Sequence, residues 1–215
     1  MKQLFTICFF SIALAASAQV SNDPAAKKIL DAVSAKFRSY KSPQAQFTYK
    51  VENAQGKALS TKKGTVTMKG AKYRVSIPGM EIFSDGRTSW NYDKAANEVT
   101  VKEADNSSAD LTPQKLFTNF YDRDFLYKLN GEKKEGGRTL QEIEMTPTNK
   151  SRAYHKVYLW IDKATQTLYS ARILEKGGNR YSYTVNSFKP STNVGDAEFV
   201  FDKKKYPGVE VVDLR

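Results

Sequence analysis

The stretch DGRTSWNYDKAANEVTVKEAD, residues 85–105, indicates the fold class of this chain. It begins with a turn at 85–86 and contains a second turn-like run at 93–97. Apolar residues alternate with polar ones after each turn: Trp90, Tyr92, Val99 and Val101. A period of two places such residues on one face of a strand. The stretch therefore predicts a β-hairpin with one apolar face.

The same alternation recurs on both sides of this stretch. The strands are separated by turn residues at roughly ten-residue spacing, which is typical of an antiparallel meander. The alternating apolar positions before the stretch are Phe47, Tyr49, Val51, Val66, Met68, Tyr73, Val75 and Ile77. Those after it lie in 140–145, 157–161, 168–174 and 181–185, and AEFVFD at 197–202 predicts a last short strand.

Two segments have helical rather than strand periodicity. The first is capped by Asn22 or Asp23, continues with a proline and ends near Tyr40. The second lies within 111–127 and begins at Thr112. The apolar residues at helical spacing are Ala26, Ile29, Leu30, Val33 and Phe37 in the first and Leu116, Phe117, Phe120 and Tyr121 in the second.

These elements predict an α+β fold in which a long antiparallel sheet is accompanied by two short helices. A sheet of this length curls, closes or splits. Two helices are too few to cover its whole apolar face. The remaining apolar surface either packs on itself or is left for a ligand.

The first 18 residues are typical of a secretory signal peptide. Lys2 precedes an apolar run at 4–15, and Ala16-Ser17-Ala18 is a cleavage signal. Residues 19–215 are then expected to form a single exported domain that is soluble, because no later segment approaches transmembrane length. Cys8 lies too near the start for lipoprotein cleavage. Its removal leaves a fold without disulfides.

The chain is basic, with a formal net charge of +11 at pH 7. A basic exported protein meets anionic lipid head groups, acidic proteins or acidic polysaccharide. A solvated surface explains the charge equally well. Export and the lack of a motif argue against a nucleic-acid partner.

Catalytic and metal-binding signatures are weak. His155 stands at the start of a strand without a partner signature, so an exposed strand residue is the favoured interpretation. One histidine without a mature cysteine leaves only carboxylates as metal ligands. Carboxylates two residues apart occur at Asp122/Asp124, Glu142/Glu144 and Glu103/Asp105. On a strand this spacing puts both on one face, an arrangement that would suit a glycosidase, but solvent-facing strands show the same spacing. We expect neither an enzyme nor a cofactor.

Several segments, in order, resemble the LolA family of periplasmic outer-membrane lipoprotein carriers. They are DPAAKKILDAV, AQFTYKV, GTVTMKGAKYRV, SDGRTSWNYDKAANEVTV, KVYLWIDKATQTL and the tail FVFDKKKYPGVEVVDLR. The resemblance covers essentially the whole exported chain. Its most specific parts are the G-T-x-x-M-K-G-x-K-Y-R and S-D-G-x-T-x-W-x-Y segments.

This resemblance implies an incomplete β-barrel whose apolar concave face is covered by helices. It also implies a carrier that holds the acyl chains of a lipoprotein in the cavity. The donor would be an inner-membrane ABC transporter that releases lipoproteins, and the recipient an outer-membrane acceptor of unknown identity. A shuttle of this kind has no need to be more than a monomer.

Candidate residues follow from the alternation and the resemblance together. The expected cavity wall comprises Phe47, Tyr49, Tyr73, Val75, Ile77, Phe83, Trp90, Tyr92, Val99 and Val101. The expected lid comprises Ile29, Leu30, Val33, Phe37, Leu116, Phe117 and Phe120. Alternation does not say which sheet face is concave, so ordinary core packing remains the alternative for each residue.

One position departs from the family pattern. An Arg that hydrogen-bonds the lid in well-known members is replaced here by Gly70. A gated lid is therefore less firmly implied than the fold. Other functions also stay open: a periplasmic carrier or sensor of other lipids on the same scaffold, or a polysaccharide-binding protein or hydrolase with no cavity.

Overall fold

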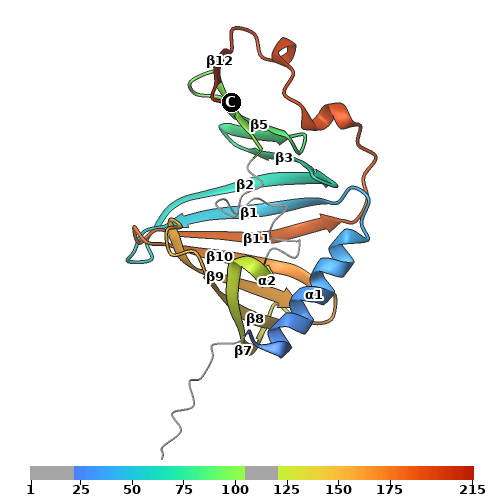
Figure 1. Cartoon of the computed structure of the whole chain (residues 1–215), viewed down its shortest axis with the longest axis vertical. Coiled ribbons are helices and arrows are strands. Elements are labelled where there is room, and N and C mark those ends of the chain that lie inside the picture. Colours follow the sequence, from blue (N-terminus) through green and yellow to red (C-terminus); the bar gives the residue numbers. More distant parts are fainter. Residues whose placement is uncertain (1–21, 105–120) are drawn as a thin grey trace, which may run out of the picture.

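The computed structural model describes residues 22–104 and 121–215, which form one 12-stranded sheet with a helix packed on it (Figure 1). The helices are α1 (Pro24–Arg38) and α2 (Tyr121–Asp124), with short 3-10 helices η2 (Asp196–Phe199) and η3 (Lys203–Lys205). The strands are β1 (Gln44–Glu52), β2 (Ala58–Lys69), β3 (Lys72–Ile77), β4 (Met80–Ser84), β5 (Thr88–Asp93), β6 (Glu98–Glu103), β7 (Phe125–Glu135), β8 (Arg138–Pro147), β9 (Tyr154–Asp162), β10 (Thr167–Glu175), β11 (Arg180–Lys189) and β12 (Glu210–Asp213).

The sheet is open, as the sequence predicts for an incomplete barrel. Its strand order is β12-β6-β5-β4-β3-β2-β1-β11-β10-β9-β8-β7, so β12 and β7 are the two edges. All neighbours pair antiparallel except β12, which runs parallel to β6. The first strand, β1, lies between β2 and β11. Strands β1 to β6 form one meander and strands β7 to β11 form a second. The two meanders are joined into one sheet by the pairing of β1 with β11.

The helix α1 forms where the sequence predicts it. Asp23 caps its first turn through a hydrogen bond from the backbone N–H of Ala25 (2.8 Å), and Pro24 occupies the first helical position. Its apolar stripe, which includes buried Leu30 and Val33, packs on side chains of β7 to β10. We call the sheet face that α1 covers the inner face and the opposite one the outer face.

Two local expectations were wrong. The strands do not resume at Leu140, because β7 (Phe125–Glu135) precedes them and follows α2 directly. AEFVFD is not a strand, since it begins in η2 and continues as extended chain. The tail after Pro207 contributes β12 to the sheet.

The segment from η2 to β12 packs on the outer face of the β4–β6 region. Phe201 lies against Phe83 with ring centroids 5.7 Å apart, and Tyr206 lies 4.5 Å from Tyr92. Val99 and Val209 complete this cluster. The sheet therefore has an inner core at one end and an outer core at the other.

Candidate functional site

The inner face of β1, β2, β3, β4 and β11 presents a continuous apolar surface. Its buried residues are Ala45, Phe47, Val66, Met68 and Val75. Its partly buried residues are Tyr49, Tyr73, Ile77, Ile82, Tyr183, Val185 and Phe188, and Phe37 of α1 packs against them from outside the set. We call this set the inner wall.

Five of the ten predicted cavity residues belong to the inner wall. They are Phe47, Tyr49, Tyr73, Val75 and Ile77. Register explains why they lie together. In the two strand pairs Ala45 lies opposite Val66 and Val66 opposite Val75, and opposed residues share a face.

The other five predicted cavity residues lie on the outer face, where the structure separates them from the inner wall. They are Phe83, Trp90, Tyr92, Val99 and Val101. Phe83 is only 3% exposed and packs under the C-terminal segment. Because Phe83 pairs with Arg74 rather than with Val75, the large residues of β4–β6 alternate onto the other face.

The inner wall also contains residues that the sequence did not nominate. They are Ala45, Val66, Met68, Ile82, Tyr183, Val185 and Phe188. The pairing of Phe47 with Val185 and of Tyr49 with Tyr183 brings β11 alongside β1. The alternation in 181–185 marked a strand, but no local signal indicates that this strand pairs with β1.

The α1 part of the expected lid lies over the inner face. Leu30 and Val33 are buried against β7–β10, and Ile29 packs partly against the same cluster. Phe37, near the end of the helix, reaches the inner wall. The remaining lid candidates, Leu116, Phe117 and Phe120, lie outside the described residues.

A small cavity of about 120 Å³ lies beneath the last turns of α1. Its apolar lining residues are Val33, Phe37, Tyr40, Ala45, Met68, Leu168, Val185 and Phe188. Ligand pockets are typically about 300–1,000 Å³. With α1 in this position the cavity is too small for a whole acyl chain.

A larger hollow of about 660 Å³ opens where β3 leaves β2. Its side chains are mainly polar or charged and include Gln46, Lys63, Thr65 and Lys94. Size alone would make it the first candidate for a ligand site. The inner wall, of which Phe47 and Ile77 also line this hollow, is the stronger candidate for an apolar ligand, because within the described residues it offers a continuous apolar surface.

Aromatic rings form a ladder along the inner wall. The ring of Tyr49 stacks on that of Tyr183 with centroids 5.0 Å apart and on that of Tyr181 at 6.1 Å. Phe47 lies 6.2 Å from Tyr183. Burial raises the pKa of Tyr183 above its ordinary value, and the nearby hydroxyls of Tyr49 and Tyr181 raise it further. The hydroxyl of Tyr183 is thus the most desolvated of the ladder.

Polar contacts hold α1 against the sheet near both of its ends. Lys27 pairs at 2.7 Å with Asp122 of α2, the short helix that precedes β7. Near the end of the helix, the ammonium of Lys36 donates to the backbone carbonyl of Thr165. Gly70 occupies a left-handed turn conformation with φ +57°, which disfavours any larger residue. Gly70 has no side chain that could reach α1. The side-chain hydrogen bond between α1 and a backbone carbonyl therefore comes from Lys36.

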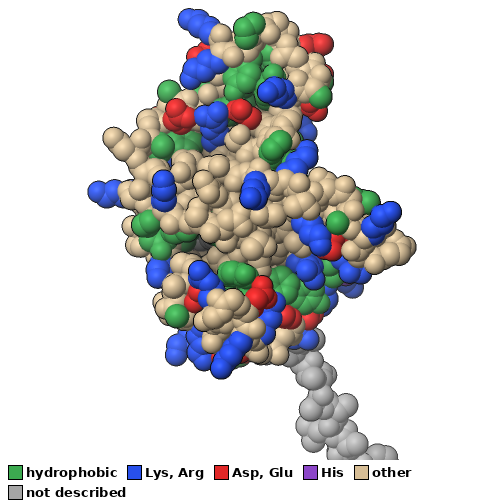
Figure 2. Space-filling model, turned by 180° about the vertical axis from the view of Figure 1, so that it is seen from behind, with side chains coloured by type: hydrophobic (Ala, Val, Ile, Leu, Met, Phe, Trp, Pro, Cys, Tyr) green, Lys and Arg blue, Asp and Glu red, His purple; other side chains and the backbone are tan. Residues whose placement is uncertain are grey.

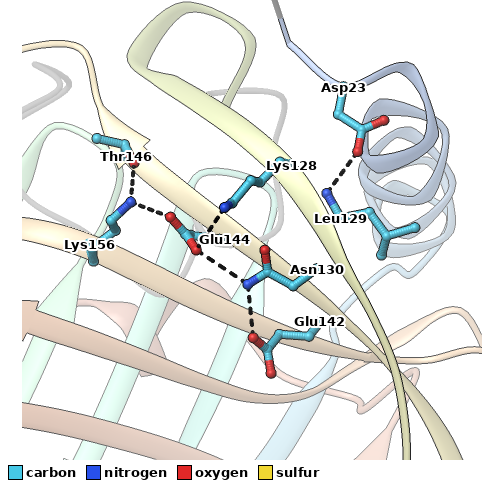
Figure 3. A network of polar contacts seen from close by, with 8 residues as sticks. All are labelled: Asp23, Lys128, Leu129, Asn130, Glu142, Glu144, Thr146 and Lys156. Atoms are coloured by element: carbon cyan, nitrogen blue, oxygen red, sulfur yellow. Dashed lines mark hydrogen bonds and ion pairs between the residues drawn. The ribbon is translucent and has the colours of Figure 1, made fainter.

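The paired carboxylates belong to structural networks. Glu144 accepts hydrogen bonds from Lys156 and Asn130, and Glu142 accepts from Asn130 and Trp160, as Figure 3 shows for all but Trp160. Burial acts to raise the pKa of Glu144, but these hydrogen bonds outweigh it and hold the pKa below its ordinary value. A general acid needs the opposite shift.

The other carboxylate pairs are also occupied or only partly described. Asp124 is buried beside Arg152 at 3.6 Å, and Asp122 is engaged by Lys27 and Tyr127. Asp105 lies outside the described residues, and His155 is exposed, as expected. No cluster of potential metal ligands occurs within residues 22–104 and 121–215.

The view from behind shows a surface on which Lys and Arg are spread widely, with acidic side chains between them (Figure 2). Much of its middle is backbone and uncharged polar side chains. Over the ranges that the structure describes, no helix has the length and apolarity needed to cross a membrane.

Comparison with known proteins agrees with this architecture. The family model described as "Outer membrane lipoprotein carrier protein LolA" matches residues 38–202. Outer-membrane lipoprotein carrier proteins of Pseudoalteromonas translucida and Sodalis glossinidius are 27% and 26% identical to the chain. These matches cover 99% and 100% of this chain and 98% of each relative.

A solved structure shares the fold. An uncharacterized conserved protein from Thermus thermophilus superposes with a TM-score of 0.60 at 16% identity. The superposition covers 88% of this chain and 99% of that one. With the family model spanning most of the open sheet and its inner wall, the chain belongs to the LolA family.

Proposed function

We propose that this protein is a non-catalytic periplasmic carrier that shields the acyl chains of lipoproteins on its inner wall. The observation that carries the proposal is the inner wall itself. Seven of its apolar side chains, among them Tyr49, Ile77 and Val185, are only partly buried although they form one continuous surface. Carrier names among the relatives support the same function.

The energetics of this task fit a broad apolar surface. Burial of a methylene group is worth about 0.8 kcal/mol, so an acyl chain of about sixteen carbons costs on the order of 12 kcal/mol to expose. A carrier must shield this surface and also release it. The partly buried aromatic side chains offer large, adaptable contact area without demanding one ligand shape.

The proposed route begins with export. Cleavage after Ala18 would release residues 19–215 into the periplasm as a monomer. An inner-membrane ABC transporter would then load the lipoprotein, and an outer-membrane acceptor would receive it. Outward movement of α1 would open the inner wall for loading, because the cavity beneath the helix is small in the present position.

Native mass spectrometry of the protein purified from its own periplasm tests the cargo. Co-purification of an acylated lipoprotein is the expected result. Bound phospholipid or fatty acid would instead indicate a carrier or sensor of other lipids. An unliganded mass together with no uptake of an acyl probe would refute the carrier function.

A matched pair of variants tests the site. Ile77→Glu places a charge on the inner wall and should abolish binding of a fluorescent acyl probe. Ser76→Glu places the same charge on the outer face one residue away and should leave binding intact. Circular dichroism establishes that both variants are folded. Equal binding by both folded variants would contradict the assignment of the inner wall.

A further inference from the structure

The inner wall changes from apolar to polar along three neighbouring strands. On β11 the residues on this face run from Phe188 through Val185 and Tyr183 to Tyr181. On β2 they run, in the same spatial direction, from Met68 through Val66 and Gly64 to Lys62 and Ser60. On β1 they run from Ala45 through Phe47 to Tyr49 and Val51. On β1, β2 and β11 one end of the wall is thus hydrocarbon and hydroxyl groups first appear midway, whereas on β3 Tyr73 brings a hydroxyl opposite Met68.

Two hydroxyls at this transition lack partners. Among the described residues, neither the hydroxyl of Tyr49 nor that of Tyr183 makes a hydrogen bond, yet neither is sealed from solvent. Tyr181, the next ring of the ladder, donates to Glu175 at 3.1 Å. Partly buried Tyr92 and Tyr206 also donate to carboxyl or amide oxygens. A poorly hydrated tyrosine hydroxyl usually has a partner.

The two hydroxyls are available as donors. Burial comes first among the causes that raise the pKa of Tyr49 and of Tyr183, so both keep their protons at neutral pH. Because the two residues are opposed in register and their rings stack at 5.0 Å, their hydroxyls lie on the same side of the sheet. A purely apolar wall would be served as well by phenylalanine, as at Phe47.

We propose that Tyr49 and Tyr183 form a polar subsite that donates hydrogen bonds to the carbonyl oxygen at the root of a bound acyl chain. The hydrocarbon tail then lies toward the partly buried Val185 and Phe188, and the head group lies toward Tyr181 and Lys62. This inference rests on the proposed function, because it concerns the same wall. It adds a chemical preference: acyl esters and amides are bound more tightly than ethers of equal length.

A pair of ligands that differ only in the carbonyl tests the subsite. The probes are monopalmitoylglycerol, an ester, and hexadecyl glycerol ether, and dissociation constants are measured by displacement of a fluorescent fatty acid. One hydrogen bond corresponds to about a five- to tenfold difference in affinity. The wild-type protein should prefer the ester by about this factor.

The variants Tyr49→Phe and Tyr183→Phe should weaken ester binding to the level of the ether while leaving ether binding unchanged. Tyr158→Phe is the matched control, because Tyr158 stacks on Trp160 of the outer face, 6.1 Å away, and has no role in the wall. Equal ester-to-ether ratios in the wild type and both wall variants would overturn the inference. Failure of both ligands to bind the wild type would overturn the proposed function as well.

The carbonyl can belong to a lipoprotein or to a phospholipid, and a second pair of probes separates them. A dipalmitoylglyceryl-cysteine peptide and dipalmitoyl phosphatidylglycerol are compared on the wild type and on Tyr183→Phe. The probe that binds more tightly identifies the source, and the inference requires that Tyr183→Phe weaken it about five- to tenfold. An unchanged affinity for both probes contradicts the subsite.

Discussion

Asp23 accepts a hydrogen bond from the backbone N–H of Leu129 at 2.9 Å (Figure 3). The residue that caps α1 therefore also satisfies a backbone N–H on the unpaired edge of β7. The neighbouring Asn22 accepts from the N–H of Tyr127 at 3.0 Å. An edge strand with free N–H groups invites pairing with other chains. The start of the helix thus protects the edge of the sheet.

The two roles of Asp23 can be separated by substitution. Asp23→Asn keeps an oxygen for the helix cap but replaces the second acceptor with an amide, so only the Leu129 N–H loses its partner. Asp23→Ala removes both acceptors. We expect Leu129 to exchange its amide hydrogen about tenfold faster in both variants, and Ala25 only in Asp23→Ala. Unchanged protection of Leu129 in Asp23→Asn would contradict the edge role.

Acid should release the C-terminal segment. Lys69 and Lys72 each lie 2.8 Å from Asp196 and lower its pKa to about 2. Because the folded pKa lies below the unfolded value near 3.8, this contribution is present above about pH 4 and is lost as the pH falls through about 2. Pepsin should therefore cleave within 196–209 faster at pH 2 than at pH 4.

Asp196→Asn provides the control for this acid effect. The variant lacks the titrating group, so its C-terminal segment should already be cleaved faster at pH 4. Its further acceleration at pH 2 should be smaller than that of the wild type. An identical pH profile for both proteins would show that Asp196 does not hold the segment.

Gly64 makes room for the inner wall. A Cβ at this position would lie 2.4 Å from Cγ2 of Ile77, 2.7 Å from Cζ of Phe47 and 2.8 Å from the carbonyl oxygen of Ser76. Gly64→Ala should lower the free energy of unfolding by about 1–3 kcal/mol and weaken binding of acyl probes. Gly177→Ala, which meets no atom within 4 Å, should leave both unchanged. Urea denaturation and probe titration measure the two effects.

Lys36 should control how readily α1 opens. Lys36→Met keeps the aliphatic stem but removes the donor to Thr165, so an acyl probe should bind several-fold faster in stopped-flow experiments. Lys28→Met removes an exposed charge from the same helix and should not change the association rate. Equal rates for both variants would show that the Lys36 contact does not restrain α1.

Local patterns predicted α1, its cap and most of the strands, because these depend on residues near one another in sequence. They did not indicate which large residues share a face. Pro78-Gly79 is a two-residue turn that opposes Ile77 to Met80 and therefore Val75 to Ile82. This register puts Phe83 on the outer face. The length of the turn is therefore a sequence signal from which the division of the large residues between the two faces could have been predicted.

Long-range pairing was beyond local reasoning. The partner of β1 is β11, and the sequence of neither strand indicates that the two pair. Likewise, β12 pairs with β6 in parallel, and the cluster of Phe83 and Tyr92 is completed by Phe201 and Tyr206 from the far end of the chain. Alternation identifies an apolar face but not the segment that covers it.

The β1–β11 pair has a consequence for the order in which the protein folds. Each meander can form from local contacts, but the pair that joins them brings residue 47 beside residue 185. Contacts of such sequence separation form slowly, because a long loop must close first. When the chain is exported with its N-terminus first, the inner wall is incomplete until β11 has also crossed and paired with β1. A truncation before residue 180 should therefore yield two half-sheets and no carrier.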